Sequence, residues 1–156
     1  MIKVAVVVVS SKIAQGLEED KGKVSLTELV ASIPGTLVSY EVVPDAASIL
    51  RERLKILTDG GVADVVFTVG GTGVRPTDIV PEVTLEVADK EIPGIGEAMR
   101  WESLKKVQTA MLSRATAGIR GKTLIVNLPG SPRGAKENLS VVLPVLEHTI
   151  DKMQGR

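Results

Sequence analysis

The ten residues Asp64–Gly73 read DVVFTVGGTG, and they place a short apolar run directly before a glycine-rich loop. The run has the length and the β-branched composition of a buried strand. Glycines at the carboxyl end of such a strand let backbone N–H groups approach an anion, because no Cβ stands in the way. Asp78, five residues beyond Gly73, adds a carboxylate that is able to hold a metal ion against a phosphate. The stretch therefore predicts a site for a nucleotide or another phosphorylated ligand.

Strand-like and helix-like segments alternate on both sides of this stretch. The predicted strands are Lys3–Val9, Leu37–Val43, Asp64–Val69 and Thr123–Leu128. Nearly continuous apolar runs are typical of strands covered on both faces, so a mostly parallel sheet is expected. Helical spacing covers Leu26–Ile33, Ile49–Leu57 and Gly134–Met153, and Pro144 marks a kink or a restart in the last helix. The alternation predicts a single-domain, Rossmann-like three-layer α/β/α fold with a mostly parallel central sheet over residues 1–156.

Composition and charge exclude several classes of function. The 19 basic and 19 acidic residues balance, so no net field attracts nucleic acid. Only Tyr40, Phe67 and Trp101 are aromatic, which is too few for a base-stacking surface. Cysteine is absent, which excludes disulfides and thiolate chemistry. The single histidine, His148, is expected to have a structural role and cannot by itself form a multi-histidine metal centre.

The apolar N-terminus, Met1–Ser10, resembles a signal peptide only superficially. Its apolar run is short, its basic region is one lysine, and β-branched residues dominate. A buried first strand is therefore the expected structure, with no membrane segment and a cytoplasmic location.

Four unusual loops follow the four predicted strands. They are Ser10-Ser11, Pro44-Asp45, Gly70–Asp78 and Pro129–Pro132. Ligands of α/β folds collect at the carboxyl ends of the strands, so we expect these loops to form one site. In this arrangement Asp45 and Asp78 are expected at adjacent strand ends, beside the glycine loop.

Ordinary structural roles compete with ligand binding at each of these positions. Gly70–Gly73 is also compatible with a tight strand-to-helix turn that binds nothing. Asp45 and Asp78 each precede a helical segment, where an aspartate acts as an N-cap. Ser131 is placed either to cap the last helix or to offer its hydroxyl and N–H to an anion. Arg114 either reaches a phosphate or stays a solvated surface charge.

The standard nucleotide-binding motifs are absent. Pro76 stands where a dinucleotide fingerprint needs its third glycine, and the glycine loop has no Walker lysine. Gly121-Lys122-Thr123 contains a Gly-Lys-Thr triplet, but Thr116 occupies the required glycine position and a strand follows. This triplet is a false match, so the candidate site depends on the loops alone.

The order of these residues resembles the molybdenum-cofactor biosynthesis family of molybdopterin adenylyltransferases, the MoaB/Mog type. The matching stretches are Thr68–Gly73, Asp78 with Pro81-Glu82, Pro93–Arg100, Leu112–Arg114, Asn127–Pro132 and Lys136–Leu139. The resemblance covers essentially the whole chain.

The resemblance implies an activity and a set of site residues. The implied reaction is transfer of AMP from ATP to the terminal phosphate of molybdopterin, with Mg²⁺ as cofactor and release of pyrophosphate. A homotrimer or homohexamer and a downstream metal-insertion protein are also implied. Asp45 and Asp78 match family carboxylates that would position Mg²⁺ and the ATP phosphates. The remaining expected ligand contacts are Gly70, Gly71, Thr72 and Gly73 for phosphate, and Ser113, Arg114, Pro129, Gly130 and Ser131 for the pterin or its phosphate.

Three positions depart from the family pattern. Ser11 stands where an aspartate is common, and Val80 replaces a threonine. Thr77 replaces the arginine that precedes the second aspartate, although Arg75 lies two residues earlier. These departures keep open a non-catalytic pterin-binding or scaffold role within the family. A third alternative is a nucleotide reaction of the competence/damage-inducible family, which resembles this fold but generally carries an additional domain.

Overall fold

A computed structural model describes all residues from Met1 to Arg156, and a six-stranded sheet forms its centre. The strands are β1 (Ile2–Val9), β2 (Gly35–Val43), β3 (Val65–Val69), β4 (Lys90–Glu91), β5 (Ala117–Arg120) and β6 (Thr123–Leu128). Their order across the sheet is β2-β1-β3-β6-β5-β4. The first four of these are mutually parallel, whereas β5 and β4 pair in antiparallel fashion. The four predicted strands are therefore confirmed, with small changes at their ends.

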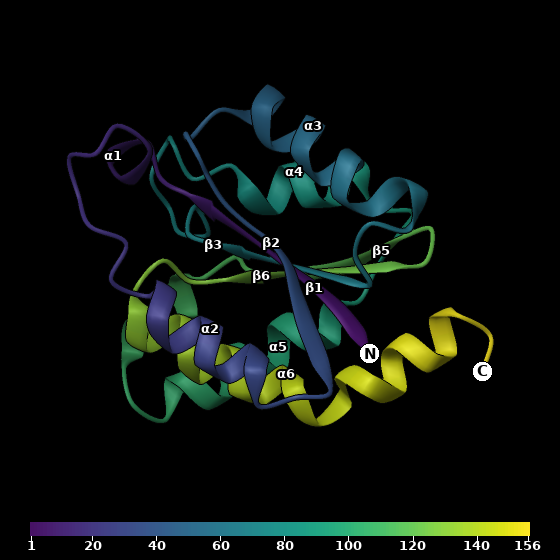
Figure 1. The fold of residues 1–156 in the computed structure, drawn as a ribbon. Coiled ribbons are helices and arrows are strands. Elements are labelled where there is room, and N and C mark those ends of the chain that lie inside the picture. The colour runs from purple at the N-terminus through teal and green to yellow at the C-terminus, as the bar shows by residue number, and fades with distance from the viewer.

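Helices cover both faces of the sheet (Figure 1). One layer holds α3 (Ala47–Thr58) and α4 (Val80–Val87), and the other holds α2 (Lys23–Ala31), α5 (Pro93–Leu104) and α6 (Pro132–Met153). The short elements are α1 (Ser11–Ala14), η1 (Asp59–Gly61) and η2 (Gln108–Leu112). The predicted three-layer α/β/α fold is confirmed. The expected restart at Pro144 is wrong, because α6 continues through it while its apolar stripe stays packed on the sheet.

The central strand β1 shows why the predicted strands are continuous apolar runs. Val4, Val6 and Val8 pack with the layer of α2, α5 and α6. Ala5, Val7 and Val9 of β1 pack with α3 and α4 on the other face. Successive strand side chains point to opposite faces, so a strand between two helix layers needs apolar residues at every position.

The parallel strands end nearly level with one another. Val9 of β1 pairs with Val43 of β2, and Val69 of β3 pairs with Leu128 of β6. The loops that follow these four residues therefore start along one edge of the sheet, on the left of Figure 1 near α1. The structure thus brings all four expected loops to the same edge.

The strands β4 and β5 were not expected from the sequence, because they contain only 2 and 4 residues. Arg120 of β5 pairs with Thr123 of β6, so Gly121-Lys122 is a two-residue hairpin turn. Gly121 has a φ of 58°, which explains the glycine at this position. The Gly-Lys-Thr triplet therefore belongs to a hairpin, in agreement with its interpretation as a false match.

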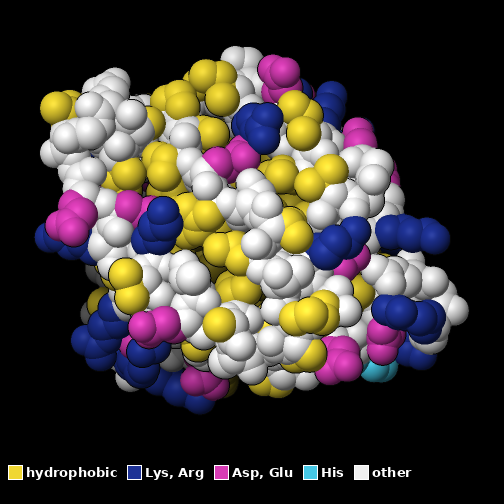
Figure 2. All heavy atoms as spheres, in the orientation of Figure 1, with side chains coloured by type: hydrophobic (Ala, Val, Ile, Leu, Met, Phe, Trp, Pro, Cys, Tyr) yellow, Lys and Arg dark blue, Asp and Glu magenta, His cyan; other side chains and the backbone are white.

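Strand β2 forms the open edge of the sheet. Figure 2 shows this face, where apolar side chains gather along the strand between the two helix layers. The guanidinium of Arg53 donates two hydrogen bonds, of 2.6 and 2.9 Å, to the carboxylate of Glu41 on β2. Charges of this kind discourage pairing with another sheet edge. No helix of the chain combines the length and the apolar character that crossing a bilayer requires.

A buried polar network joins the strands that carry the site. The amide nitrogen of Asn127, which is fully buried, donates to the hydroxyls of Thr68 and Thr84 at 3.0 and 2.9 Å. Its amide oxygen accepts a hydrogen bond from the backbone N–H of Thr116 at 3.2 Å. One side chain thus ties β6 to β3, to α4 and to the segment before β5.

We expect Asn127→Ala to lower the free energy of unfolding by about 2–4 kcal/mol, because it leaves buried polar groups unpaired and opens a cavity. Thr149→Ala is the control, since it removes a helical hydroxyl that bonds only the carbonyl of Val145. The control should change the free energy by about 0.5 kcal/mol or less. Urea unfolding at a fixed protein concentration measures both. Equal losses of unfolding free energy in the two variants would show that the Asn127 network stabilises the protein no more than one exposed helical hydroxyl does.

Candidate functional site

The two candidate aspartates lie half-buried at the same sheet edge but not after adjacent strands. β1 lies between β2 and β3, so two strand spacings, about 10 Å, separate the strands that precede Asp45 and Asp78. The expectation of adjacent strand ends is therefore wrong, because strand order is set by long-range pairing. The N-cap alternative is wrong as well. The caps of α3 and α4 are Ala46 and Ile79, and neither helix has a side-chain cap.

Asp45 is held by Ser11 from the neighbouring strand end. Its Oδ2 accepts from the backbone N–H of Ser11 at 3.1 Å, and its own N–H donates to the Ser11 hydroxyl at 2.9 Å. These reciprocal bonds fix the carboxylate beside the loop after β1. Oδ1 has no hydrogen-bond partner in the protein and Asp45 forms no ion pair, so one oxygen stays available to a ligand. The sequence gives no local signal for this pairing, because 34 residues separate the two.

The glycine loop requires glycine at its first two positions. Gly70 and Gly71 have φ values of 98° and 68°, a region that strongly favours glycine. A Cβ on Gly70 would lie 2.7 Å from the carbonyl oxygen of Val9. A Cβ on Gly71 would lie 2.5 Å from Cγ2 of Val80. The loop therefore turns sharply and packs its underside against β1 and the start of α4.

The same loop presents a row of unpaired backbone donors. The N–H groups of Gly71, Thr72, Gly73 and Val74 donate no hydrogen bond within the protein. The N–H groups of Gly130 and Ser131 are likewise unpaired. The two loops touch, since a Cβ on Gly130 would lie 3.3 Å from Cα of Gly70. Such a concentration of unpaired N–H groups is suited to bind an anion. Ligand binding at this loop stays a prediction.

Asp78 closes the loop on itself. Its Oδ2 accepts from the backbone N–H of Arg75 at 2.9 Å and lies beside Gly73, where an added Cβ would come within 2.9 Å of it. Its Oδ1 has no hydrogen-bond partner in the protein, and Asp78 forms no ion pair. A carboxylate with one free oxygen thus stands next to the row of N–H donors.

Ser131 caps α6, and its expected role in binding an anion stays a prediction. Its hydroxyl oxygen accepts from the N–H of Gly134 at 3.1 Å and caps α6, as one alternative predicted. Its backbone N–H remains unpaired, and its hydroxyl proton donates to no protein acceptor. Capping therefore leaves two donors of Ser131 available to a ligand at the start of α6.

Arg114 does not remain a solvated surface charge. Its backbone N–H donates to the carbonyl of Thr72 at 2.8 Å, and its Nε donates to the carbonyl of Gly73 at 2.7 Å. A terminal nitrogen donates to the backbone carbonyl of Asp78 at 2.9 Å. The other terminal nitrogen pairs with Glu82 of α4, and this carboxylate raises the pKa of Arg114 above its usual range. The expected phosphate contact of this residue stays a prediction.

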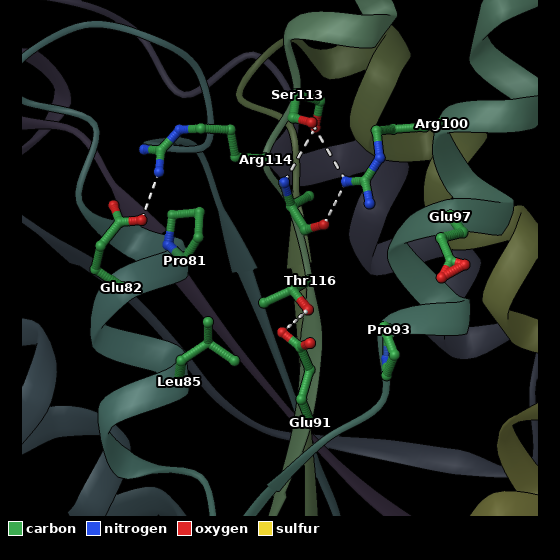
Figure 3. A pocket seen from close by; sticks show the side chains of 11 residues that line it. Pro81, Glu82, Leu85, Glu91, Pro93, Glu97, Arg100, Ser113, Arg114 and Thr116 are labelled. Carbon is green, nitrogen blue, oxygen red and sulfur yellow. Dashed lines mark hydrogen bonds and ion pairs between the residues drawn. The ribbon is translucent and has the colours of Figure 1, made fainter.

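A second arginine fixes the segment that carries Ser113 and Arg114. Arg100 of α5 donates to the carbonyls of Ser113 and Ala115, at 3.3 and 2.6 Å (Figure 3). Gly96 permits this approach, because a Cβ there would lie 2.4 Å from the carbonyl oxygen of Ala115. The motif Pro93–Arg100 therefore serves to anchor the segment 113–115. No local pattern in the sequence indicates this role, because the bonded residues are 13 and 15 positions apart.

A pocket of about 250 Å³ lies between α4 and α5 beside this segment. In Figure 3, Arg100 approaches the pocket from α5, and the side chain of Arg114, which also lines it, extends toward Glu82 of α4. Glu91 accepts a hydrogen bond from the hydroxyl of Thr116 at the far end of the pocket. Ser113, which was expected to contact the ligand, lines this pocket. His148 lies exposed on α6 and takes part in none of these contacts.

The geometry defines a three-layer α/β protein with a glycine loop of unpaired backbone N–H groups at the carboxyl edge of its parallel strands. A family described as "Probable molybdopterin binding domain" matches residues 5–148 of the chain. The chain therefore belongs to this molybdopterin-binding family.

Curated relatives and solved structures agree with this assignment. A molybdopterin adenylyltransferase of Helicobacter pylori is 38% identical over 156 residues, which cover 99% of this chain and 89% of the relative. The enzyme of the same name from Escherichia coli is 41% identical over 143 residues, with coverages of 90% and 73%. The crystal structure of the molybdopterin biosynthesis enzyme MoaB from Thermus thermophilus has a TM-score of 0.94 and 42% identity, covering 100% of this chain and 98% of its own.

Two further solved structures share the fold at lower sequence identity. MoaB from Pyrococcus furiosus, described as a tungsten cofactor synthesizing protein, has a TM-score of 0.89 and 34% identity, with coverages of 99% and 98%. The protein CinA from Thermoplasma acidophilum has a TM-score of 0.72 at 15% identity, covering 92% of this chain and 98% of its own. At that identity the likeness concerns the fold alone.

We expect Gly71→Ala to destabilise the protein for two separate reasons. The positive φ costs an L-residue about 1–2 kcal/mol, and the clash with Val80 adds about 1–3 kcal/mol. Gly16→Ala is a matched control, because Gly16 has a φ of 75° but no atom within 4 Å of its Cβ position. The Gly16→Ala control should lose only the free energy that the positive φ costs, because its Cβ meets no other atom. Thermal and urea unfolding at equal protein concentration give the comparison, and identical losses would argue against the clash.

Proposed function

We propose that this protein is a molybdopterin adenylyltransferase, which transfers AMP from ATP to the terminal phosphate of molybdopterin and releases pyrophosphate. The observation that carries the proposal is the row of unpaired N–H groups at Gly71–Val74, with the half-buried carboxylates of Asp45 and Asp78 at the same sheet edge. Unpaired N–H groups suit phosphate oxygens, and carboxylates suit the metal ion that accompanies a triphosphate. The activity named for the relatives from H. pylori and E. coli supports the same assignment.

The proposed chemistry needs alignment more than it needs a reactive side chain. A phosphate oxygen of molybdopterin attacks the α-phosphorus of ATP, and the bond from that phosphorus to the bridging oxygen of pyrophosphate breaks. Both reactants are anions, so the protein must hold them in line and offset their repulsion. The N–H groups of the glycine loop and of Gly130 and Ser131 do this with partial positive charges. A direct transfer requires no covalent intermediate, which fits a chain without cysteine.

We assign the binding of Mg²⁺ to Asp45 and Asp78. Each carboxylate keeps one oxygen without a protein partner, and no group of three or more acidic, histidine or cysteine side chains forms a complete metal site. Mg²⁺ bound with nucleotide phosphates typically takes only one or two protein carboxylates, so even one of these aspartates beside the bound phosphates would be enough. When bound, the ion supplies charge neutralisation and polarises the phosphate oxygens.

The departures from the family pattern spare the proposed contacts. Val80 is fully buried beneath Gly71, so its side chain supports the loop from the side away from solvent. Arg75 is exposed and forms no ion pair, which leaves its guanidinium free to meet a phosphate. Both features favour the catalytic assignment over a scaffold that binds pterin without turnover.

Pyrophosphate release from purified protein, molybdopterin and Mg·ATP tests the proposal. Release that requires molybdopterin and yields adenylylated product is the expected result. Bound molybdopterin without release would replace the transferase with the carrier or scaffold alternative. Nucleotide binding without any molybdopterin binding would favour the third alternative, a different nucleotide reaction on this fold.

Asp78→Asn should abolish AMP transfer while the fold persists. The asparagine oxygen can still accept from the N–H of Arg75, so the loop is retained, whereas the negative charge that attracts Mg²⁺ is lost. We expect a fall in kcat/KM of at least about 100-fold, measured by pyrophosphate release. Asp151→Asn, which affects a surface ion pair with Arg156, should leave the rate unchanged. Full activity in Asp78→Asn would remove the proposed role of this carboxylate.

We also propose that the protein self-associates, as a homotrimer or homohexamer. Five large apolar side chains on α5, η2 and the turn between them are 39% to 71% exposed: Trp101, Leu104, Val107, Met111 and Leu112. An exposed apolar patch of this kind marks a contact surface.

The reaction would take place in the cytoplasm, where ATP is available, and its product would pass to a metal-insertion protein.

Trp101→Glu should dissociate the assembly, because it places a charge in the apolar contact. Light scattering after gel filtration would then report a lower mass than for the unaltered protein. Leu17→Glu serves as control, since Leu17 is 75% exposed in the loop after α1, outside this patch. A mass that is the same in both variants and in the unaltered protein would argue against this contact surface.

A further inference from the structure

Arg114 is the only side chain outside the glycine loop that donates hydrogen bonds to it. It bonds the middle and the end of the loop Gly70–Asp78, because its Nε bonds the carbonyl of Gly73 and its terminal nitrogen bonds the carbonyl of Asp78, at 2.7 and 2.9 Å. Its backbone N–H adds a third bond, to the carbonyl of Thr72 at 2.8 Å. Three carbonyls of one loop therefore converge on a single residue.

This convergence sets the direction of the N–H groups that follow each carbonyl. The chain contains no cis peptide bond, and in a trans peptide the C=O and the following N–H point in opposite directions. When the carbonyls of Thr72 and Gly73 face Arg114, the N–H groups of Gly73 and Val74 face away from it. Those two N–H groups are among the unpaired donors of the loop.

We propose that Arg114 is a positioning residue: it turns the loop carbonyls outward so that the loop N–H groups face the phosphate, and it does not contact the ligand itself. The inference rests on the proposed function for the identity of the ligand, a nucleoside triphosphate. It differs from the expectation that Arg114 is a phosphate or pterin contact.

Two contacts hold Arg114 in this position. Glu82 of α4 pairs with the terminal nitrogen that does not bond the loop. Arg100 of α5 binds the carbonyls on either side of Arg114, those of Ser113 and Ala115. In Figure 3 the Arg114 side chain extends toward α4 and Arg100 approaches from α5. The loop is thus braced from both helices that border the pocket.

A direct phosphate contact would behave differently from a positioning role. Lysine keeps the positive charge but lacks the planar fork that binds two carbonyls at once, so it would serve a phosphate contact better than a positioning role. Removing the charge of Glu82 would free a phosphate-binding arginine and tighten ligand binding. The same change would loosen a positioning arginine and weaken binding. These opposite signs allow the two roles to be separated.

The test uses Arg114→Gln, Arg114→Lys and Glu82→Gln in the full chain. Arg51→Gln is the matched control, because Arg51 pairs with Glu86 of the same helix α4. Arg51 and Glu86 are 33% and 53% exposed, close to the 39% and 57% of Arg114 and Glu82. Two quantities are measured: hydrogen–deuterium exchange of the hydrogen-bonded loop amides, those of Arg75, Asp78 and Val80, and binding of Mg·ATP by calorimetry.

We expect faster exchange of the Arg75, Asp78 and Val80 amides and about 10- to 100-fold weaker Mg·ATP binding in Arg114→Gln, because the loop loosens and the donors lose their orientation. Arg114→Lys should resemble Arg114→Gln, and Glu82→Gln should weaken binding by a smaller factor. Arg51→Gln should match the unaltered protein in both measurements. Unchanged exchange in Arg114→Gln would overturn the inference. Binding retained in Arg114→Lys, or tightened in Glu82→Gln, would overturn it in favour of direct contact.

Failure of this inference is distinguishable from failure of the proposed function. If the unaltered protein bound no Mg·ATP, the proposed function would fail, while the exchange of the Arg75, Asp78 and Val80 amides would still decide whether Arg114 holds the loop. If the unaltered protein bound Mg·ATP and transferred AMP, but the loop and its affinity were insensitive to Arg114→Gln, the inference alone would fail.

Discussion

Burial of the parallel strands on both faces is the constraint on which the rest of the structure depends. β1, β3 and β6 lie between two helix layers, so nearly all of their side chains are apolar and their backbone polar groups must pair within the sheet. Parallel pairing in register then brings the carboxyl ends of these strands to one level. The loops that follow have to leave the sheet together, and this places the residues of the site side by side.

The site itself is built mainly from backbone. In the loop after β3 the N–H groups from Gly71 to Val74 do not pair with the sheet, and the loop after β6 adds two more unpaired donors. Backbone donors are preorganised, because the fold has already fixed them before a ligand arrives. In the proposed function, the two aspartates, each with one free oxygen, supply the charge that a metal–nucleotide complex requires.

Long-range hydrogen bonds hold this backbone in shape. Ser11 fixes Asp45 across a strand boundary, and Arg100 fixes the segment from which Arg114 reaches the glycine loop. Each of these contacts joins residues that are distant in sequence but neighbours at the sheet edge. The departure at Ser11 has a clear local role, because its hydroxyl and N–H are the groups that anchor Asp45.

The sequence by itself determined the four main strands, the three-layer class, the edge at which the loops gather and the glycine loop with its two aspartates. These features follow from local periodicity and from residue types whose backbone preferences are intrinsic. Only the tertiary structure decided that β1 separates the strands of Asp45 and Asp78, that two short strands complete the sheet, and that Arg114 bonds the glycine loop. Strand order and side-chain partners depend on pairings across tens of residues, and no local pattern in the chain encodes them.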